Sequence, residues 1–131
     1  MATPFLLWGS IATLTGVIFG AFGAHGLKAL ITPELLNAYQ TGVHYQIWHG
    51  LGLILLHMLT QQTPTSTLLI RAGAIMLAGI ILFSGSLYLL AMLNLRWLGM
   101  ITPIGGLCFI SAWTMVVIYA AKSQASTHTA Q

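Results

Sequence analysis

The sequence predicts an all-α membrane protein, folded as an antiparallel four-helix transmembrane bundle in a single domain. Of its 131 residues, 57% are hydrophobic and 4% are charged, whereas about a quarter of the residues in an average soluble domain are charged. The few charged side chains leave four uncharged intervals: residues 1–27, 35–70, 72–95 and 97–121. Each interval supplies the ~20 residues that cross a hydrocarbon core about 30 Å thick at about 1.5 Å per residue.

The first span is predicted over residues 5–24, with Pro4 in a favourable first-turn position and Gly26 as the stop. The small residues at 21–24 resemble a signal-peptide cleavage site. No basic side chain precedes them, however, and the uncharged run exceeds the roughly 7 to 15 apolar residues of a signal peptide. We therefore expect a retained helix.

The second span, about residues 35–60, is expected to begin outside the membrane. Thr32, Pro33 and Glu34 combine a capping residue, a proline for the first helical position and an acid in the first turn. The first half of this helix is too polar to face lipid, whereas residues 51–59 are apolar enough to do so. Its polar side chains are Asn37, Tyr39, Gln40, Thr41, His44, Tyr45 and Gln46.

The third and fourth spans are predicted at residues 67–93 and 98–121. Arg71 lies one turn inside the third and is expected to extend toward the headgroups. Pro103 predicts a kink in the fourth, because proline removes a backbone donor. The polar segment 123–131 is expected to be a mobile tail, and the short connections favour up-down-up-down topology.

The charges barely determine the orientation of the chain. Four spans place both termini on one side of the membrane. The positive charges on that side are the N-terminal amine, Arg71 and Lys122, and those on the other side are Lys28 and Arg96, so the two sides nearly balance. We expect cytoplasmic termini, with dual-topology insertion as the alternative. The basic residues are scattered singly, so the sequence does not predict nucleic-acid binding.

A row of small residues in the first span predicts close helix packing. Ala12, Gly16, Gly20 and Ala24 recur every four residues and include a GxxxG pair. Small residues let helix backbones approach closely in lipid, where van der Waals contact drives association. The row fits intrachain packing, and a homodimer face is the alternative.

Three histidines, His25, His44 and His49, are expected near one membrane face. His44 and His49 point about 140° apart on one helix, and acids are nearly absent, so no metal site is predicted. His44 and His57 are 13 residues apart, a spacing that resembles haem-binding bundles, but only His25 is available as a partner. His128 falls in the tail.

A polar pocket is the preferred hypothesis for a site. Its candidate residues are His25, Tyr45, Gln46, His49, Ser84 and Ser86. Polar groups within a membrane are functional candidates, and such a pocket would take a lipid headgroup, a quinone or a small solute. The alternative is that these side chains only bridge helices, because buried polar groups need partners.

The sequence resembles the uncharacterised YgdD/YwdK-type family of small membrane proteins. Four blocks carry this resemblance in order along almost the whole chain: Gly20–His25, Thr41–Gly42 with Tyr45–Gln46 and His49, Leu82–Tyr88, and Thr102–Gly106. The resemblance implies a four-span protein of the bacterial inner membrane, with relatives in eukaryotic organelles. It implies no established activity and no catalytic residues.

The function predicted from these observations is that of a non-enzymatic accessory or small-ligand- or lipid-binding module without a cofactor. Glu34 is the only acid, and Cys108 has no histidine nearby in the sequence and reads as a small core residue. The alternatives are a small homodimeric transporter or channel, and a single-haem or quinone-binding redox subunit. Membrane lipid is the expected partner, with a homo-oligomer or another membrane protein as further possibilities.

Overall fold

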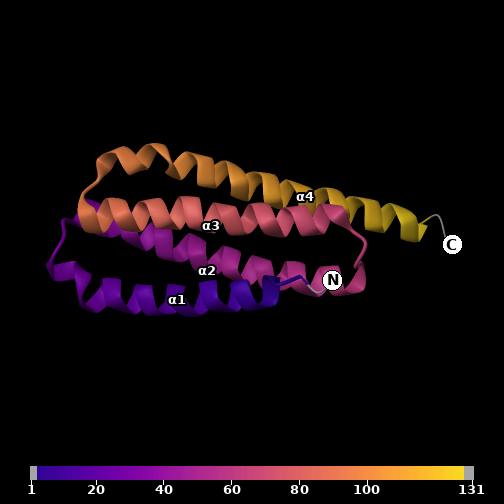
Figure 1. Ribbon diagram of the computed structural model, residues 1–131, viewed down its shortest axis with the longest axis horizontal. Helices are drawn as coiled ribbons and strands as arrows, with labels where there is room; N and C mark the ends of the chain where they lie inside the picture. Colours follow the sequence, from indigo (N-terminus) through magenta and orange to yellow (C-terminus); the bar gives the residue numbers. More distant parts are fainter. Residues whose placement is uncertain (1–2, 129–131) are drawn as a thin grey trace.

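The computed structural model describes residues 3–128, and every regular element within them is helical (Figure 1). Two short 3₁₀ segments, η1 and η2, lie in connections between four long helices. The elements are α1 (Phe5–His25), η1 (Leu27–Ala29), α2 (Pro33–Gln62), α3 (Thr67–Leu93), η2 (Arg96–Met100) and α4 (Thr102–His128).

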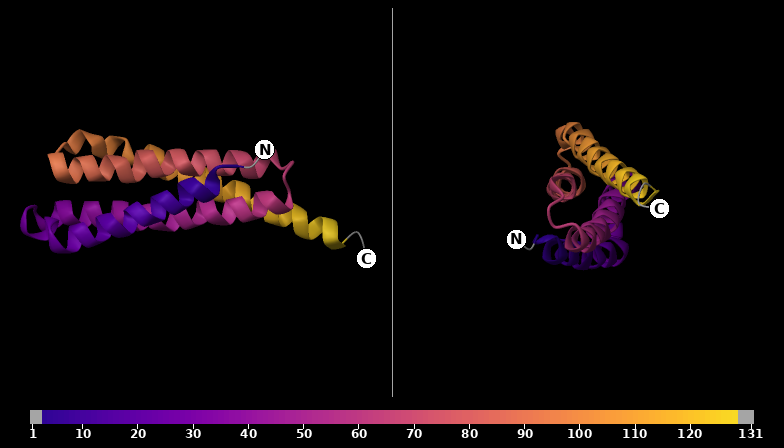
Figure 2. Two further views of the ribbon diagram at one scale, coloured as in Figure 1. Left: turned by 60° about the horizontal axis from the view of Figure 1, so that its bottom comes forward. Right: turned by 90° about the vertical axis from the view of Figure 1, so that its right-hand side faces the viewer.

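The four long helices run alternately up and down and pack in chain order. Helix α1 packs on α2, α2 on α3, and α3 on α4, so α1 and α4 are the outer members of the series. Figures 1 and 2 show α1 beginning and α4 ending at the same end of the molecule, where the last turns of α4 extend beyond the other helices.

Three helical segments are long and apolar enough to cross a membrane by length and composition: Phe5–Ala29, Thr67–Leu93 and Arg96–Ser126. Helix α2 does not meet this criterion, although it has 30 residues. The polar side chains of its first half lower its average hydropathy, as the sequence indicated. The structure thus contains four long helices, three of which qualify as spans.

Local sequence signals determine where the helices begin and end. The Thr32 hydroxyl accepts a hydrogen bond from the backbone N–H of Leu35, and Pro33 is the first residue of α2, which confirms the predicted start. Gly26 ends α1, also as predicted. The Ser66 hydroxyl caps α3 in the same way, through the backbone N–H of Leu69.

Two expectations for the last helix are wrong. Pro103 is the second residue of α4, where its missing N–H costs no helical hydrogen bond, so it starts the helix rather than kinking it. Helix α4 also continues from Lys122 through the segment predicted as a tail, as far as His128. Residues 129–131 lie outside the described residues.

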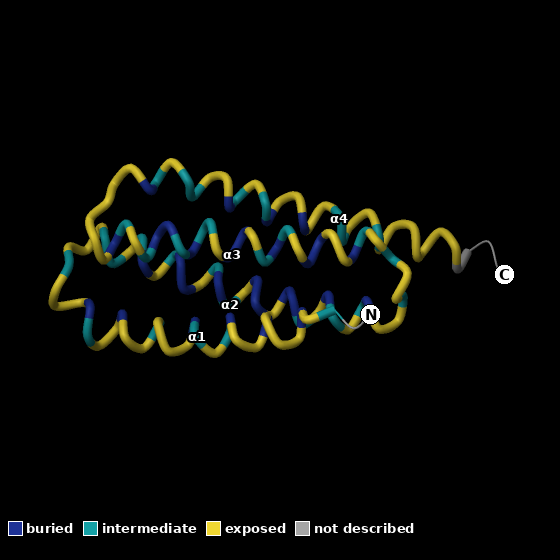
Figure 3. Tube along the Cα trace, in the orientation of Figure 1, coloured by how far each residue is buried: buried dark blue, intermediate teal, exposed yellow. Residues whose placement is uncertain are grey.

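The buried side chains form two clusters along the helix contacts (Figure 3). The larger cluster joins all four long helices and includes Leu53, Leu69, Met76 and Phe109. The smaller lies toward the α1–α2 connection and includes Tyr39. The outward surfaces of α1 and α4 carry large apolar side chains, as expected of helices that face lipid.

The predicted row of small residues faces α2 along part of its length. Ala12 and Gly16 are buried, and a Cβ atom added at Gly16 would lie 2.6 Å from Cγ1 of Ile47. Gly20 is half-buried, and Ala24 is exposed. The contacts are within one chain.

Glycines spaced seven residues apart describe the α1–α2 contact better than the four-residue spacing. Gly9 and Gly23 continue the line of Gly16: a Cβ atom at Gly9 would lie 2.6 Å from the Gly50 carbonyl oxygen, and one at Gly23 would lie 2.6 Å from Cε1 of Tyr39. Each glycine therefore lets a part of α2 approach the α1 backbone closely.

Asn94 ends α3 in the left-handed conformation, with φ 53° and ψ 33°. We expect Asn94→Val to lower the free energy of unfolding by about 1 to 2 kcal/mol, because a β-branched residue is strained there. Asn94→Gly should leave it unchanged or raise it slightly. Thermal unfolding in detergent, followed by circular dichroism, measures both, and equal effects of the two substitutions would contradict this account.

Candidate functional site

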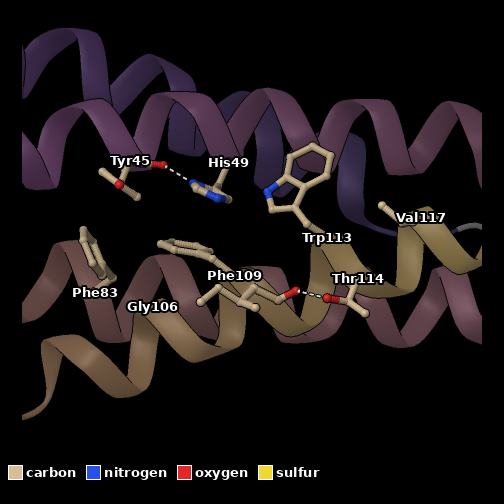
Figure 4. A pocket seen from close by; sticks show the side chains of 9 residues that line it. Tyr45, His49, Phe83, Gly106, Phe109, Trp113, Thr114 and Val117 are labelled. Atoms are coloured by element: carbon tan, nitrogen blue, oxygen red, sulfur yellow. Dashed lines mark hydrogen bonds between the residues drawn. The ribbon is translucent and has the colours of Figure 1, made fainter.

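A cleft of about 580 Å³ lies between α2, α3 and α4 (Figure 4). Two of its side chains come from α2, one from α3 and the rest from one face of α4. The lining residues are Tyr45, His49, Phe83, Gly106, Phe109, Ile110, Trp113, Thr114 and Val117. The cleft is thus mainly apolar and aromatic, and its volume falls in the range of about 300 to 1,000 Å³ typical of small-molecule sites.

Aromatic contacts hold the walls of the cleft together. The His49 ring stacks on the Phe109 ring, with centroids 3.5 Å apart and planes inclined by 13°. Tyr45 packs against Phe83 at 4.5 Å, and Phe83 lies 5.5 Å from Phe109. These contacts join α2, α3 and α4 and fix the position of the imidazole.

The hydrogen bond of His49 determines which of its nitrogens carries the proton. Its Nδ1 lies 2.8 Å from the Tyr45 carbonyl oxygen, which can only accept, so Nδ1 donates. In the neutral ring Nε2 is then an acceptor. Nε2 has no hydrogen-bond partner among residues 3–126, although only 6% of the surface of His49 is exposed.

Gln46 belongs to a different part of the interior. Its amide nitrogen donates to the Ala12 carbonyl and to the Thr15 hydroxyl, both at 2.8 Å, and its amide oxygen accepts from the Tyr88 hydroxyl at 2.6 Å. One side chain of α2 therefore connects α1 with α3. Gln46 and Ser84 line a separate cavity of about 280 Å³.

The two serines connect helices. The Ser84 hydroxyl donates to the Gly42 carbonyl at 2.6 Å and joins α3 to α2. The Ser86 hydroxyl lies 2.7 Å from the Thr102 hydroxyl and joins α3 to α4. His25 is exposed at the end of α1.

The structure therefore does not bring the six predicted side chains into one pocket. Tyr45 and His49 line the large cleft, whereas Gln46 and Ser84 line the separate cavity beside α1. Ser86 lies between α3 and α4, and His25 is exposed at the end of α1. The reason is helical geometry, because each residue turns the side chain by about 100°. Neighbours such as Tyr45 and Gln46 consequently face different helices.

The remaining histidines on α2 do not share a site with His49. His44 is exposed and stacks on Trp48, with ring centroids 5.7 Å apart. Nδ1 of His57 is buried without a hydrogen-bond partner in the described part of the chain. No group of three histidine, cysteine or acidic side chains within residues 3–126 is placed to hold a metal ion.

The α4 wall of the cleft was missed by the sequence reasoning. Gly106, Phe109, Trp113 and Val117 recur at intervals of three or four and so share one helix face. An aromatic pair at this spacing beside a glycine was visible in the sequence. It carries no polar signal, however, whereas the predicted site was composed of polar residues.

Comparison with known proteins identifies the family. Residues 19–106 match the family described as "Protein of unknown function (DUF423)". The UPF0382 membrane protein YwdK of Bacillus subtilis is 44% identical over 118 residues, which cover 90% of this chain and 96% of that protein. The UPF0382 membrane protein SH2409 of Staphylococcus haemolyticus is 42% identical over 118 residues, with 90% and 95% covered.

No solved structure matches the chain. The matched region, residues 19–106, contains all four sequence blocks, from Gly20 to Gly106. The match with YwdK covers 96% of that protein. Three helical segments of this chain are long and apolar enough to span a membrane. The chain therefore belongs to the DUF423 family and is a membrane protein.

Proposed function

We propose that this protein is a non-enzymatic membrane module that binds a small apolar ligand or a lipid in the cleft between α2, α3 and α4. The observation that carries the proposal is the cleft, whose aromatic walls are held by the His49–Phe109 stack and which contains the unpaired acceptor Nε2 of the largely buried His49. Ligand sites in membrane bundles are built in this way, from apolar walls and a few polar groups.

The chemistry of the cleft supports binding rather than catalysis. Its lining includes no acid, lysine, arginine or cysteine. Of the hydroxyl groups in the wall, that of Thr114 donates to the Ile110 carbonyl of its own helix at 2.8 Å. Neither the Tyr45 nor the Thr114 hydroxyl is hydrogen-bonded to His49, so the lining shows no activated nucleophile.

The placement of α2 supports a complete four-span bundle. The helix lies antiparallel between α1 and α3 and packs on both, which favours a path across the same layer. Gln46 of α2 is paired through Ala12, Thr15 and Tyr88, and the Gly42 carbonyl of α2 accepts from the Ser84 hydroxyl of α3, which is the kind of pairing that a span with polar residues requires. We place this bundle in the bacterial inner membrane with cytoplasmic termini.

A variant that fills the cleft tests the proposal. Gly106 lines the cleft, and the nearest side-chain atoms to an added Cβ are 3.9 Å away, so Gly106→Leu should enter the cleft without a clash. We expect wild-type protein, released from native membranes in nanodiscs, to carry a small bound molecule in native mass spectrometry. Gly106→Leu should reduce its occupancy at least fivefold.

Leu107→Phe is the matched control. Leu107 is 63% exposed and is not among the lining residues, so enlarging it adds volume on the lipid side. Occupancy should stay at the wild-type level. Equal occupancy in all three proteins, or no bound molecule in any, would refute the proposal. The same spectra report the oligomeric state. They therefore also test the alternative prediction of a homodimeric transporter or channel, which requires a dimer.

A further inference from the structure

Among the polar atoms of the cleft, two of opposite character lie on facing helices. Nε2 of His49 on α2 is an acceptor without a partner, and the indole N–H of Trp113 on α4 is a donor without a hydrogen bond among the described residues. The ring centroids are 6.2 Å apart. Figure 4 shows the indole nitrogen on the side of Trp113 that faces His49.

The histidine is an acceptor because the ring is neutral. The chain has one acidic residue, Glu34, which is exposed in the first turn of α2. An imidazolium stacked on Phe109 in an apolar cleft would therefore lack an acid to balance its charge, which is unfavourable. With the proton on Nδ1, only Nε2 remains to meet a ligand.

A hydroxyl group satisfies both atoms at once. It donates its hydrogen to His49 Nε2 and accepts from the Trp113 N–H, whereas a ketone, an ester or an ether can only accept. Apart from the Tyr45 hydroxyl, the remaining walls are apolar or aromatic, and the hydroxyl of Thr114 is already paired within α4. The rest of the ligand is therefore expected to be mainly apolar.

We propose that the cleft binds a membrane-soluble alcohol or phenol, whose hydroxyl lies between His49 Nε2 and the Trp113 N–H. This inference rests on the proposed function, because it concerns the occupant of the same cleft. A lipid-soluble phenol and a long-chain alcohol share the required chemistry.

Matched probes test the hydroxyl in the full-length protein. We expect 4-pentylphenol to bind wild-type protein in nanodiscs at least tenfold more tightly than 4-pentylanisole, its methyl ether, in isothermal titration against empty nanodiscs. The affinity for 1-decanol, measured in the same way, shows whether a phenol or an aliphatic alcohol is the preferred source of the hydroxyl. Tighter binding of either compound than of the ether supports the proposal.

Three variants locate the contact. His49→Phe keeps the ring shape but removes the acceptor, so the phenol should bind only as well as the ether. Trp113→Phe removes the donor, so both probes should bind several-fold more weakly. Trp48→Phe changes an exposed tryptophan outside the lining and should leave both affinities unchanged.

A measurement on wild-type protein is independent of variant folding. With ¹⁵N-labelled histidine, the Nε2 resonance of His49 should move upfield on addition of the phenol and stay in place with the ether. Equal binding of phenol and ether, both abolished by Gly106→Leu, would overturn the hydroxyl proposal and leave the ligand-binding function intact. Absence of saturable binding by any probe would overturn both.

Discussion

Gly105→Ala is expected to lower the free energy of unfolding by about 3 kcal/mol, although it adds a single methyl group. Gly105 is buried where α4 crosses α3, and a Cβ atom there would collide with the backbone N and Cα of Phe83. A side chain can rotate away from such a clash, but a backbone cannot. The two helices must therefore move apart, which weakens the packing of Phe83 and Phe109.

The measurement is equilibrium unfolding in mixed micelles of dodecyl maltoside and sodium dodecyl sulfate, followed by far-ultraviolet circular dichroism. Gly85→Ala is the matched control, because Gly85 lies inside α3 and an added Cβ has no atom within 4 Å. It should be neutral or stabilising by up to about 1 kcal/mol, since alanine has the higher helix propensity. Equal destabilisation by both substitutions would show that close approach at Gly105 is unimportant.

The same substitution should also disturb the cleft. Gly105 is the neighbour of Gly106, which lines the cleft, and Phe83 contributes to both the helix crossing and the cleft wall. Separation of α3 and α4 would displace Phe109 and thereby the imidazole of His49 that stacks on it. We therefore expect Gly105→Ala to weaken binding of 4-pentylphenol in the protein that remains folded.

Helix positions were predictable because local chemistry determines them. The cap at Thr32 and the proline after it mark the start of α2, and α3 has the predicted bounds of 67–93. The sequence did not reveal that Pro103 lies in the first turn of α4, because proline suits both a helix start and a kink. The structure distinguishes these cases, because the segment before Pro103 is the separate 3₁₀ segment η2 and not an earlier part of α4.

The site was less predictable than the helices. Which face of α2 meets which helix depends on the rotation of each helix in the assembled fold, and hydropathy contains no information on that rotation. Tyr45 and His49 share a face, as their spacing of four indicates. Phe109 and Trp113 could be added only once the structure placed α4 across the cleft from α2.

Gln46→Leu is expected to destabilise the protein by about 2 to 3 kcal/mol without abolishing binding in the cleft. The substitution removes three hydrogen bonds and leaves the Ala12 carbonyl and the Tyr88 hydroxyl without this partner. Gln46 is 5% exposed, so water cannot easily replace the lost partner. The same unfolding measurement reports the loss.

Gln40→Leu provides the matched control on the same helix. Gln40 is exposed, and its side chain makes no hydrogen bond among the described residues, so the substitution should change stability by less than about 0.5 kcal/mol. An equal effect of the two substitutions would indicate that loss of a polar group from α2, rather than loss of the Gln46 contacts, causes the change.

Substitutions on the two faces of α2 should have different effects in these experiments. Gln46 fastens α2 to α1 and α3, whereas His49 faces the cleft beside α4. Gln46→Leu should therefore lower stability and retain the preference for 4-pentylphenol over its ether, whereas His49→Phe should lose that preference with a smaller change in stability. If Gln46→Leu abolished the preference in folded protein, the two polar groups would form one site, as the sequence first suggested, and the assignment of the cleft to His49 and Trp113 alone would fail.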